Sequence, residues 1–280
     1  MAITIVTDST ADLPAELAKK LGITVVPLNV QFGEDTFLDG IDIHPEEFFQ
    51  RLATEKQLPT TSQPSPGTFI ETYKPLVEAG HDIISIHVSD KLSGTLNSAR
   101  QAKEQFKDAR IELIDSEQVT LSLGLIVLAA SAEVKKGSKF DVVVAETKNA
   151  AAKVKVLGLL DTIEYLKKGG RIGKVKGFVG SILKVRPIIT AVDGLVHSAT
   201  SVRSRAAGLQ YMLTIAEEHA PLARAGVLYS TTPKEAEELA EKIRPLVSDG
   251  EVVLTRVGPV IGTHAGPGVI GLAVQSENGA

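Results

Sequence analysis

The 280-residue chain contains no cysteine and no tryptophan, and few other aromatic residues. Without cysteine there is no disulfide bond, no cysteine nucleophile and no thiolate metal site, which fits a cytoplasmic protein. Positive charge is not in excess either, because 34 acidic residues outnumber 30 lysines and arginines and the formal net charge is -4. The sequence therefore lacks the basic surface by which nucleic-acid-binding proteins hold phosphates.

A long uninterrupted hydrophobic run is also missing. The most apolar segment, residues 119–134, is broken by two serines, a glycine and a glutamate, whereas a membrane-spanning helix needs roughly 20 mostly apolar residues. The first eight residues have no positive region ahead of an apolar stretch, and they predict a buried strand instead of a secretory signal. We expect a cytoplasmic protein without stable membrane insertion, and we leave transient membrane contact open.

Motifs for metals and nucleotides are absent as well. The histidines show no paired spacing such as His-Glu-x-x-His, and no Gly-x-x-x-x-Gly-Lys-Ser/Thr loop occurs. One Gly-x-Gly-x-x-Gly match, residues 266–271, runs into an apolar strand where the dinucleotide fingerprint needs a helix. We therefore expect no metal and no cofactor.

What the chain does contain is a regular alternation of β-branched runs and amphipathic segments, which favours an α/β fold. Its length suits two domains, and 43% hydrophobic residues suffice for large cores. In the first half we expect strands at 3–6, 24–28, 83–87 and 111–114, and helices at 15–21, 45–53, 66–78, 94–106 and 121–136. After a helix at 140–153 and a strand at 156–159, which fit either half, we expect helices at 162–168, 174–183, 203–218 and 233–247, and strands at 187–191, 195–198, 225–230, 251–256 and 269–274. We place the domain boundary at residue 160, giving domains 1–160 and 161–280.

Three loops rich in hydroxyl groups and small residues lie far apart in the chain, at residues 60–65, 92–95 and 262–268. They contain no carboxylate or thiol, but they offer neutral hydrogen-bond donors on a backbone with few bulky side chains. Such loops suit a carboxylate or phosphate. The pattern indicates a protein that holds an acidic ligand.

These loops, together with residues 7–14 (Thr-Asp-Ser-Thr-Ala-Asp-Leu-Pro), resemble the DegV family of bacterial fatty-acid-binding proteins. The likeness continues through 166–173 and 183–194 and so covers nearly the whole chain. It implies two α/β domains, related to dihydroxyacetone kinase and mannose phosphotransferase domains, with the ligand between them. It also implies that the chain is a carrier without catalytic residues, which binds a long-chain fatty acid in an apolar channel and presents the carboxylate to a fatty-acid kinase for acyl-phosphate formation.

Ser93 follows a predicted strand and precedes a predicted helix, so it suits either an N-cap or an anchor for an anion at the helix terminus. The resemblance implies the second role, in which Gly94 lets the ligand approach the backbone and Thr95 completes the loop. Thr61 and Ser62 lie in a proline-rich extended segment, where successive side chains face opposite sides. We favour Thr61 as the residue that contacts the carboxylate and keep Ser62 as the alternative.

His264 lies between glycines ahead of the last strand, and Gly266 gives it an unobstructed approach to a ligand. A neutral histidine can donate one bond to a carboxylate. Arg171, after a helix end at Gly169 and Gly170, has a guanidinium suited to phosphate oxygens, and its expected role is to steady the phosphate or the partner contact. We include it in the site, and Arg203 is a weaker candidate.

Two other functions stay open. Ser93, His264 and either Asp8 or Asp115 could form the triad of a Ser/His hydrolase acting on a lipid or ester, although no Gly-x-Ser-x-Gly elbow surrounds Ser93. A lipid-sensing regulatory protein is the other alternative. For a carrier, the candidate channel linings are residues 121–132 and 177–183.

Overall fold

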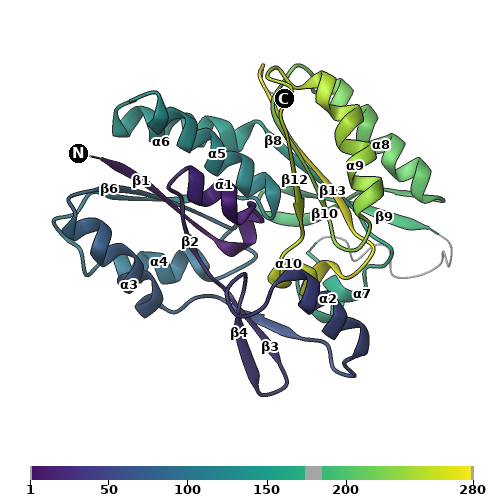
Figure 1. Ribbon diagram of the computed structural model, residues 1–280, viewed down its shortest axis with the longest axis horizontal. Helices are drawn as coiled ribbons and strands as arrows, with labels where there is room; N and C mark the ends of the chain where they lie inside the picture. The colour runs from purple at the N-terminus through teal and green to yellow at the C-terminus, as the bar shows by residue number, and fades with distance from the viewer. Residues whose placement is uncertain (1, 174–184, 279–280) are drawn as a thin grey trace.

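A computed structural model describes residues 2–173 and 185–278, and it confirms the expected α/β class, with two large sheets and one small one (Figure 1). The helix expected at 174–183, and with it the lining expected at 177–183, lies outside the described residues. Within the described ranges, no helix is both long enough and apolar enough to cross a membrane.

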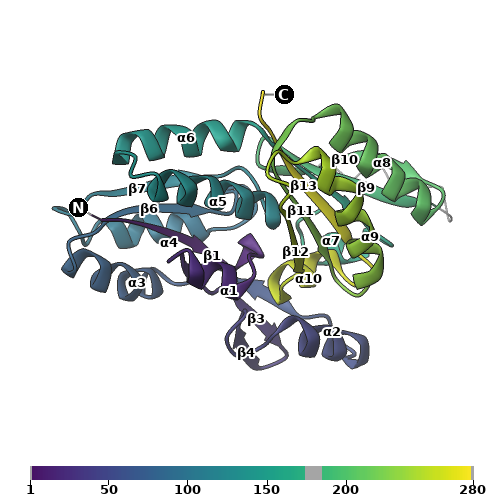
Figure 2. The same cartoon turned by 45° about the horizontal axis from the view of Figure 1, so that its top comes forward.

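The first sheet is parallel and has the strand order β2-β1-β6-β7. Its strands are β1 (Ile3–Asp8), β2 (Thr24–Val26), β6 (Asp82–His87) and β7 (Ile111–Asp115). The helices are α1 (Ala15–Lys20), α3 (Pro66–Glu78), α4 (Thr95–Lys103), α5 (Leu121–Lys135) and α6 (Phe140–Ala152). One face packs against α1, α5 and α6 and the other against α3 and α4 (Figure 2). Coverage on both faces explains why β6 is buried along its whole length.

The second sheet has six strands in the order β10-β9-β8-β13-β11-β12, and of its neighbouring pairs only β11 and β12 run parallel. Its strands are β8 (Val154–Leu159), β9 (Arg186–Val192), β10 (Leu195–Val202), β11 (Leu222–Tyr229), β12 (Val252–Arg256) and β13 (Ile270–Ser276). The remaining elements of this half are α7 (Glu164–Lys168), α8 (Arg205–Glu218), α9 (Pro233–Ile243) and the short 3-10 helix η3 (Arg244–Leu246). Because β8 pairs with β13 and β9, the chain enters this sheet between α6 and β8, ahead of residue 160.

A third, small antiparallel sheet has no counterpart among the elements expected from the sequence. It contains β3 (Asn29–Phe32), β4 (Asp35–Leu38) and β5 (Thr60–Ser62). The β3–β4 hairpin turns at Gly33, whose φ of 62° suits the first position of a tight hairpin turn. The short helix η1 (Ser9–Ala11) follows β1, while α2 (Pro45–Thr54) and α10 (Pro259–Ala265) pack against each other. Gly262 permits this contact, because a β-carbon there would lie 2.6 Å from the Phe48 ring.

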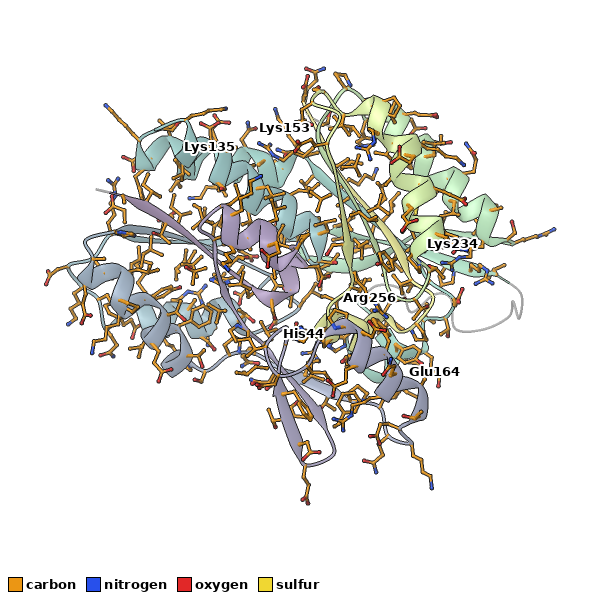
Figure 3. The ribbon with its side chains drawn as sticks, viewed as in Figure 1. His44, Lys135, Lys153, Glu164, Lys234 and Arg256 are labelled. Atoms are coloured by element: carbon orange, nitrogen blue, oxygen red, sulfur yellow. The ribbon has the colours of Figure 1, made fainter. Side chains whose placement is uncertain are left out.

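The second sheet is tied to α2 by Arg256, which Figure 3 shows beside the start of this helix at His44. Its Nε donates to the Ser230 carbonyl at 3.0 Å, and the guanidinium lies 3.9 Å from Glu46 and over the Phe49 ring. These contacts hold α2, and through it α10, at the end of the sheet.

Helix α5 lies between the two large sheets. It contacts β1 and β6 on one side and β8, β11 and β13 on the other. A β-carbon at Gly124 would lie 2.7 Å from the Ala11 carbonyl, so the helix needs glycine to approach η1 this closely. Leu121 and Leu125 share one buried cluster with Leu228 from β11. Both halves of the chain thus meet on this helix.

Candidate ligand-binding site

A cavity lies between the second sheet and the first half of the chain, with about 990 Å³ of unfilled space including its open mouth. Most of its lining is aliphatic and comes from β8, β9, β13, α10 and the loop before α5. Six polar lining residues lie close together and form what we call the polar end of the cavity: Thr61, Ser62, Gln63, Ser93, Arg171 and His264. Thr10, Thr120 and Thr190 also border the cavity. A largely apolar cavity with one polar cluster suits an amphipathic ligand.

Thr61 and His264 meet at this polar end. Thr61 Oγ1 lies 2.8 Å from His264 Nε2, joining β5 to the last turn of α10. The sequence led us to expect His264 in a glycine-rich turn, and that expectation is wrong. Pro259 at the start of α10 and the burial of Val260 and Thr263 stabilise a short helix despite Gly262. The helix fixes the direction of the imidazole ring.

Ser62 has a different environment from Thr61, as expected for neighbouring residues in a strand. Its hydroxyl accepts hydrogen bonds from Gln31 Nε2 at 3.0 Å and from Asn29 Nδ2 at 3.3 Å, both on β3. Thr61 is paired with the buried Val30 instead, and its hydroxyl faces His264. Both residues border the cavity, but the Ser62 hydroxyl already accepts from the side-chain amides of Asn29 and Gln31.

Ser93 does not cap α4. The N-cap residue is Gly94, and no side chain bonds to the free amides of the first turn. The Ser93 hydroxyl lies 2.9 Å from Thr95 Oγ1, which is buried behind it and does not border the cavity. Gly94 does not border the cavity either; a β-carbon there would lie 2.9 Å from Gln63 Nε2. The role of Gly94 is thus to make room for Gln63, a site residue that the sequence motif contained but that we did not single out.

Arg171 is held beside the same end of the cavity by two backbone carbonyls. Its Nε donates to Leu92 at 3.3 Å and its Nη1 donates to Gly169 at 2.9 Å. Gly169 in turn packs on the imidazole, because a β-carbon there would lie only 2.2 Å from His264 Nδ1. The Gly169-Gly170-Arg171 segment therefore positions a guanidinium and leaves space for the histidine ring.

Burial, and secondarily the positive charge of Arg171, lowers the pKa of His264 from 6.5 to about 4. The ring is therefore neutral at physiological pH. Its Nδ1 atom is buried and has no hydrogen-bond partner among the described residues. Two hydroxyls, a neutral imidazole and one guanidinium give this end of the cavity a single positive charge.

Gly266 and Arg203 lie away from the cavity lining. Gly266 ends α10 with a φ of 79°, and a β-carbon there would lie 2.3 Å from the Tyr165 ring. This glycine is needed for the turn and for packing against α7. Arg203 is exposed, just before α8.

The expectation that residues 121–132 line the channel is wrong. The lining ends at Val119 and Thr120, and Leu121 turns into the core that α5 shares with both sheets. Thr120 has a φ of 55°, an uncommon conformation for a β-branched residue, and its hydroxyl donates to Asp12 Oδ2. A strained residue thus begins α5 at the cavity wall.

The residues considered for a hydrolase triad are separated in the fold. Asp8 Oδ2 lies 2.9 Å from His87 Nδ1, and His87 Nε2 lies 2.7 Å from Ser85 Oγ. This Ser-His-Asp chain is completely buried and does not border the cavity. Asp115 bonds to backbone amides at Asp90 and Glu117. The bonds of both candidate acids thus go to groups other than His264.

Two buried carboxyl groups, Asp12 and Asp39, meet at the start of α10, and the sequence did not predict that they lie together. Asp12 Oδ1 accepts from the Gly258 amide at 2.9 Å, and Asp39 packs against the same residue, because a β-carbon at Gly258 would lie 3.4 Å from Asp39 Oδ1. Burial, and to a smaller extent the charge of neighbouring carboxylates, raises the pKa of Asp12 to about 8 and that of Asp39 to about 7. Asp12 stood in the recognised motif, but only the fold brings Asp39 to it. In the described part of the chain, no three histidine or carboxylate side chains gather to hold a metal.

The fold and the site define a two-domain α/β protein with a largely apolar cavity that has hydrogen-bond donors at one end. The family model that matches residues 2–277 is described as that of an uncharacterised protein of the DegV family. The chain belongs to the DegV family.

Three similar proteins illustrate the relationship. A DegV domain-containing protein of Halalkalibacterium halodurans is 35% identical over 279 residues, which cover 98% of this chain and 99% of the relative. A DegV family protein from Thermus thermophilus, whose structure is described as showing fatty acid binding, superposes with a TM-score of 0.92 at 35% identity, covering 99% and 100% of the two chains. DegV from Bacillus subtilis, described as a fatty acid binding protein, superposes with a TM-score of 0.89 at 31% identity, with the same coverage.

Proposed function

We propose that this protein binds a long-chain fatty acid in its apolar cavity, with the carboxylate at Thr61, Ser93 and His264. The observation that carries the proposal is a mostly aliphatic lining together with one cluster of polar residues around Thr61, Ser93 and His264. The fatty-acid-binding descriptions of the similar structures from Thermus thermophilus and Bacillus subtilis support it.

Each of the two hydroxyls has a second group behind it that can direct its proton toward a ligand. When His264 Nε2 donates to Thr61 Oγ1, the threonine hydroxyl is free to donate to a carboxylate oxygen. In the same way, Thr95 can donate to Ser93, whose own proton then points to the ligand. Thr95 is thus a positioning residue, and the two pairs together offer two donors to one carboxylate.

Charge and helix geometry favour an anion at the same place. The first turn of α4, next to Ser93, has no side-chain cap, and free amides at a helix N-terminus attract negative charge. Arg171 adds a positive charge close to His264. Gln63, which is exposed at the polar end of the cavity, adds an amide donor.

The acyl chain supplies most of the binding free energy in this proposal. Burial of one methylene group contributes roughly 0.8 kcal/mol, so about a dozen contribute on the order of 10 kcal/mol before ordering costs. The hydroxyl groups then orient the acid more than they hold it. We further propose that the carboxylate is presented to a fatty-acid kinase, which the family resemblance implies, and that acyl-phosphate chemistry belongs to that partner.

The decisive experiment is extraction of the purified protein with denaturing solvent, followed by mass spectrometry of the released material, with native mass spectrometry of the intact complex in parallel. We expect a near-stoichiometric fatty acid. A protein that is purified empty and also fails to bind added laurate, palmitate or stearate would overturn the proposal.

A second assay separates the carrier from a hydrolase. In one reaction the protein alone is incubated with acyl esters. In another it is incubated with a fatty acid and ATP, with and without a bacterial fatty-acid kinase subunit. A carrier shows no ester turnover, and acyl phosphate forms only when the kinase is present. Ester hydrolysis that disappears in Ser93→Ala would identify a hydrolase instead.

A further inference from the structure

One row of residues crosses the cavity wall on four neighbouring strands. Leu228 on β11 pairs with Gly271 on β13, which pairs with Gly158 on β8, which pairs with Ile189 on β9. All four residues border the cavity. The two central positions are glycine, so the wall has no side chain there.

The backbone does not require these glycines. Neither has the positive φ found at the turn glycines, and each lies in a regular strand where alanine could adopt the same conformation. Glycine is needed at both positions because neighbouring side chains occupy the space that a β-carbon would take. A β-carbon on Gly271 would lie 2.7 Å from Leu228 Cγ, and one on Gly158 would lie 3.2 Å from Ile189 Cγ1.

Leu228 and Ile189 therefore lean inward over the two glycines. Side chains normally stand nearly perpendicular to a sheet, which would place both residues in the cavity. The glycines let them lie low against the sheet, which keeps this part of the cavity open. An added methyl group at either position would push its neighbour upward into the space for the ligand.

The row starts beside the polar end, because Ile189 belongs to the same apolar cluster as Leu92 and Ala265. From there it crosses the cavity wall through the two glycines to Leu228, which belongs to the core cluster around α5. Along β8 and the residue that follows it, Val156, Gly158 and Leu160 lie two apart and all border the cavity, as does Leu157. Leu160 belongs to the same apolar cluster as Leu92 and Ala265, the neighbours of Ser93 and His264. Gly158 is about 6–7 Å farther along the strand, and Val156 is about the same distance beyond it.

We propose that the paired glycines Gly158 and Gly271 determine the length of the acyl chain that the cavity accepts. They keep a passage open between the part next to the carboxylate and the part beyond the row. This inference rests on the proposed fatty-acid function and names the residues that select its substrate. Bulk at the row closes the passage to the distal methylenes and leaves short acids able to bind.

The test compares Gly158→Ala and Gly271→Ala with the unmodified protein. Each protein is delipidated, checked by thermal unfolding, and titrated with octanoate, laurate and stearate. We expect the affinity for stearate to fall about tenfold or more, because each methylene kept out of the cavity forfeits roughly 0.8 kcal/mol. The affinity for octanoate should be nearly unchanged. Gly158→Ala needs Ile189 to shift by only a few tenths of an ångström, so it keeps the test available if Gly271→Ala unfolds.

Two controls separate shape from stability. Gly226→Ala lies on the same sheet face, but its methyl group would meet Leu121 in the core, 2.4 Å away, and not the cavity. It should lower the melting temperature and leave the preference among the three acids unchanged. The double variant Gly271→Ala/Leu228→Ala restores room over the row and should recover stearate binding.

The outcomes distinguish this inference from the proposed function. Equal affinity changes for all three acids, or no change in folded glycine variants, would overturn the role of the row while fatty acid binding stands. Failure of the unmodified protein to bind any acid would overturn the proposed function first, and the inference with it.

Discussion

Asp12 and Asp39 lie against the same point of the backbone at the start of α10. A β-carbon at Gly258 would lie 2.8 Å from Asp12 Oδ1 and 3.4 Å from Asp39 Oδ1. Asp12 accepts from the Gly258 amide and Asp39 packs against the same residue, so both carboxyl groups contact the start of the helix that carries His264. Any change in their protonation therefore acts on the helix that positions the site.

The first prediction concerns pH and stability. Burial raises the pKa of Asp12 to about 8 and of Asp39 to about 7, so the folded protein retains protons that the unfolded chain loses near pH 4. The stabilisation is fully present below the unfolded pKa values and is lost as pH rises through the folded ones, by up to about 1.4 kcal/mol per pH unit for each group. Urea unfolding between about pH 4 and pH 8 should show this loss. Asp39→Asn should reduce the slope, and an identical slope in the variant would contradict the assignment.

The second prediction separates Thr61 from Ser62. Thr61→Val keeps the shape of the side chain but removes the hydroxyl that faces His264, and it should weaken fatty acid binding by about tenfold to a hundredfold, the value of a hydrogen bond to a charged group. Ser62→Ala is the matched control, because its hydroxyl is engaged by Gln31 and Asn29. Isothermal titration measures both. A larger loss in Ser62→Ala would reverse the assignment.

The third prediction tests why the pKa of His264 is low. Titration of the ring by NMR should give a value near 4 in the ligand-free protein, since burial is the main cause and Arg171 the second. Arg171→Gln should raise this pKa only partly toward 6.5, because the burial remains. Arg203→Gln, an exposed arginine, is the control and should leave it unchanged. A full return to 6.5 in Arg171→Gln would show that charge and not burial dominates.

The fourth prediction concerns Gly169 and Gly170, which differ in what a methyl group would meet. At Gly169 it would lie 2.2 Å from His264 Nδ1, so Gly169→Ala should displace the ring from Thr61 and weaken binding. At Gly170, with a φ of 72°, it would meet nothing within 4 Å, so Gly170→Ala should cost stability only. Melting temperature and affinity are measured on both variants. Gly169→Ala should show the larger loss of affinity, and Gly170→Ala should show the larger loss of melting temperature. Equal affinities in the two variants would argue against the contact at Gly169.

Local sequence patterns were sufficient to predict most of the architecture. The alternation of β-branched runs with amphipathic segments predicted all four strands of the parallel sheet, because burial on both faces requires nearly continuous apolar residues. The hydroxyl-rich motifs led to Thr61, Ser93 and His264, and the glycine pair at 169–170 led to Arg171; the fold brings all four to the cavity. Their contact with a ligand stays a prediction.

Features that depend on distant pairing could not be predicted in this way. Helix α10 has only seven residues, most of them weak helix formers, and glycines lie on both sides of it. It forms because it packs against Phe48 and Phe49 of α2. Strand β5 is too short to recognise alone, and its partner β3 supplies the hydrogen bonds. The pairing of Gly158 with Gly271 follows from the antiparallel register of β8 and β13, which no local pattern encodes.

The position of α5 has a consequence for how the molecule unfolds. Leu121 and Leu125 belong to a cluster that also contains Val30 from the first half and Leu228 and Val260 from the second. Neither sheet can separate from α5 without opening the core that the helix shares with the other sheet. The two halves should therefore melt in one cooperative transition, with equal calorimetric and van't Hoff enthalpies. Each half expressed alone would leave one side of α5, or the sheet surface that it covers, open to water.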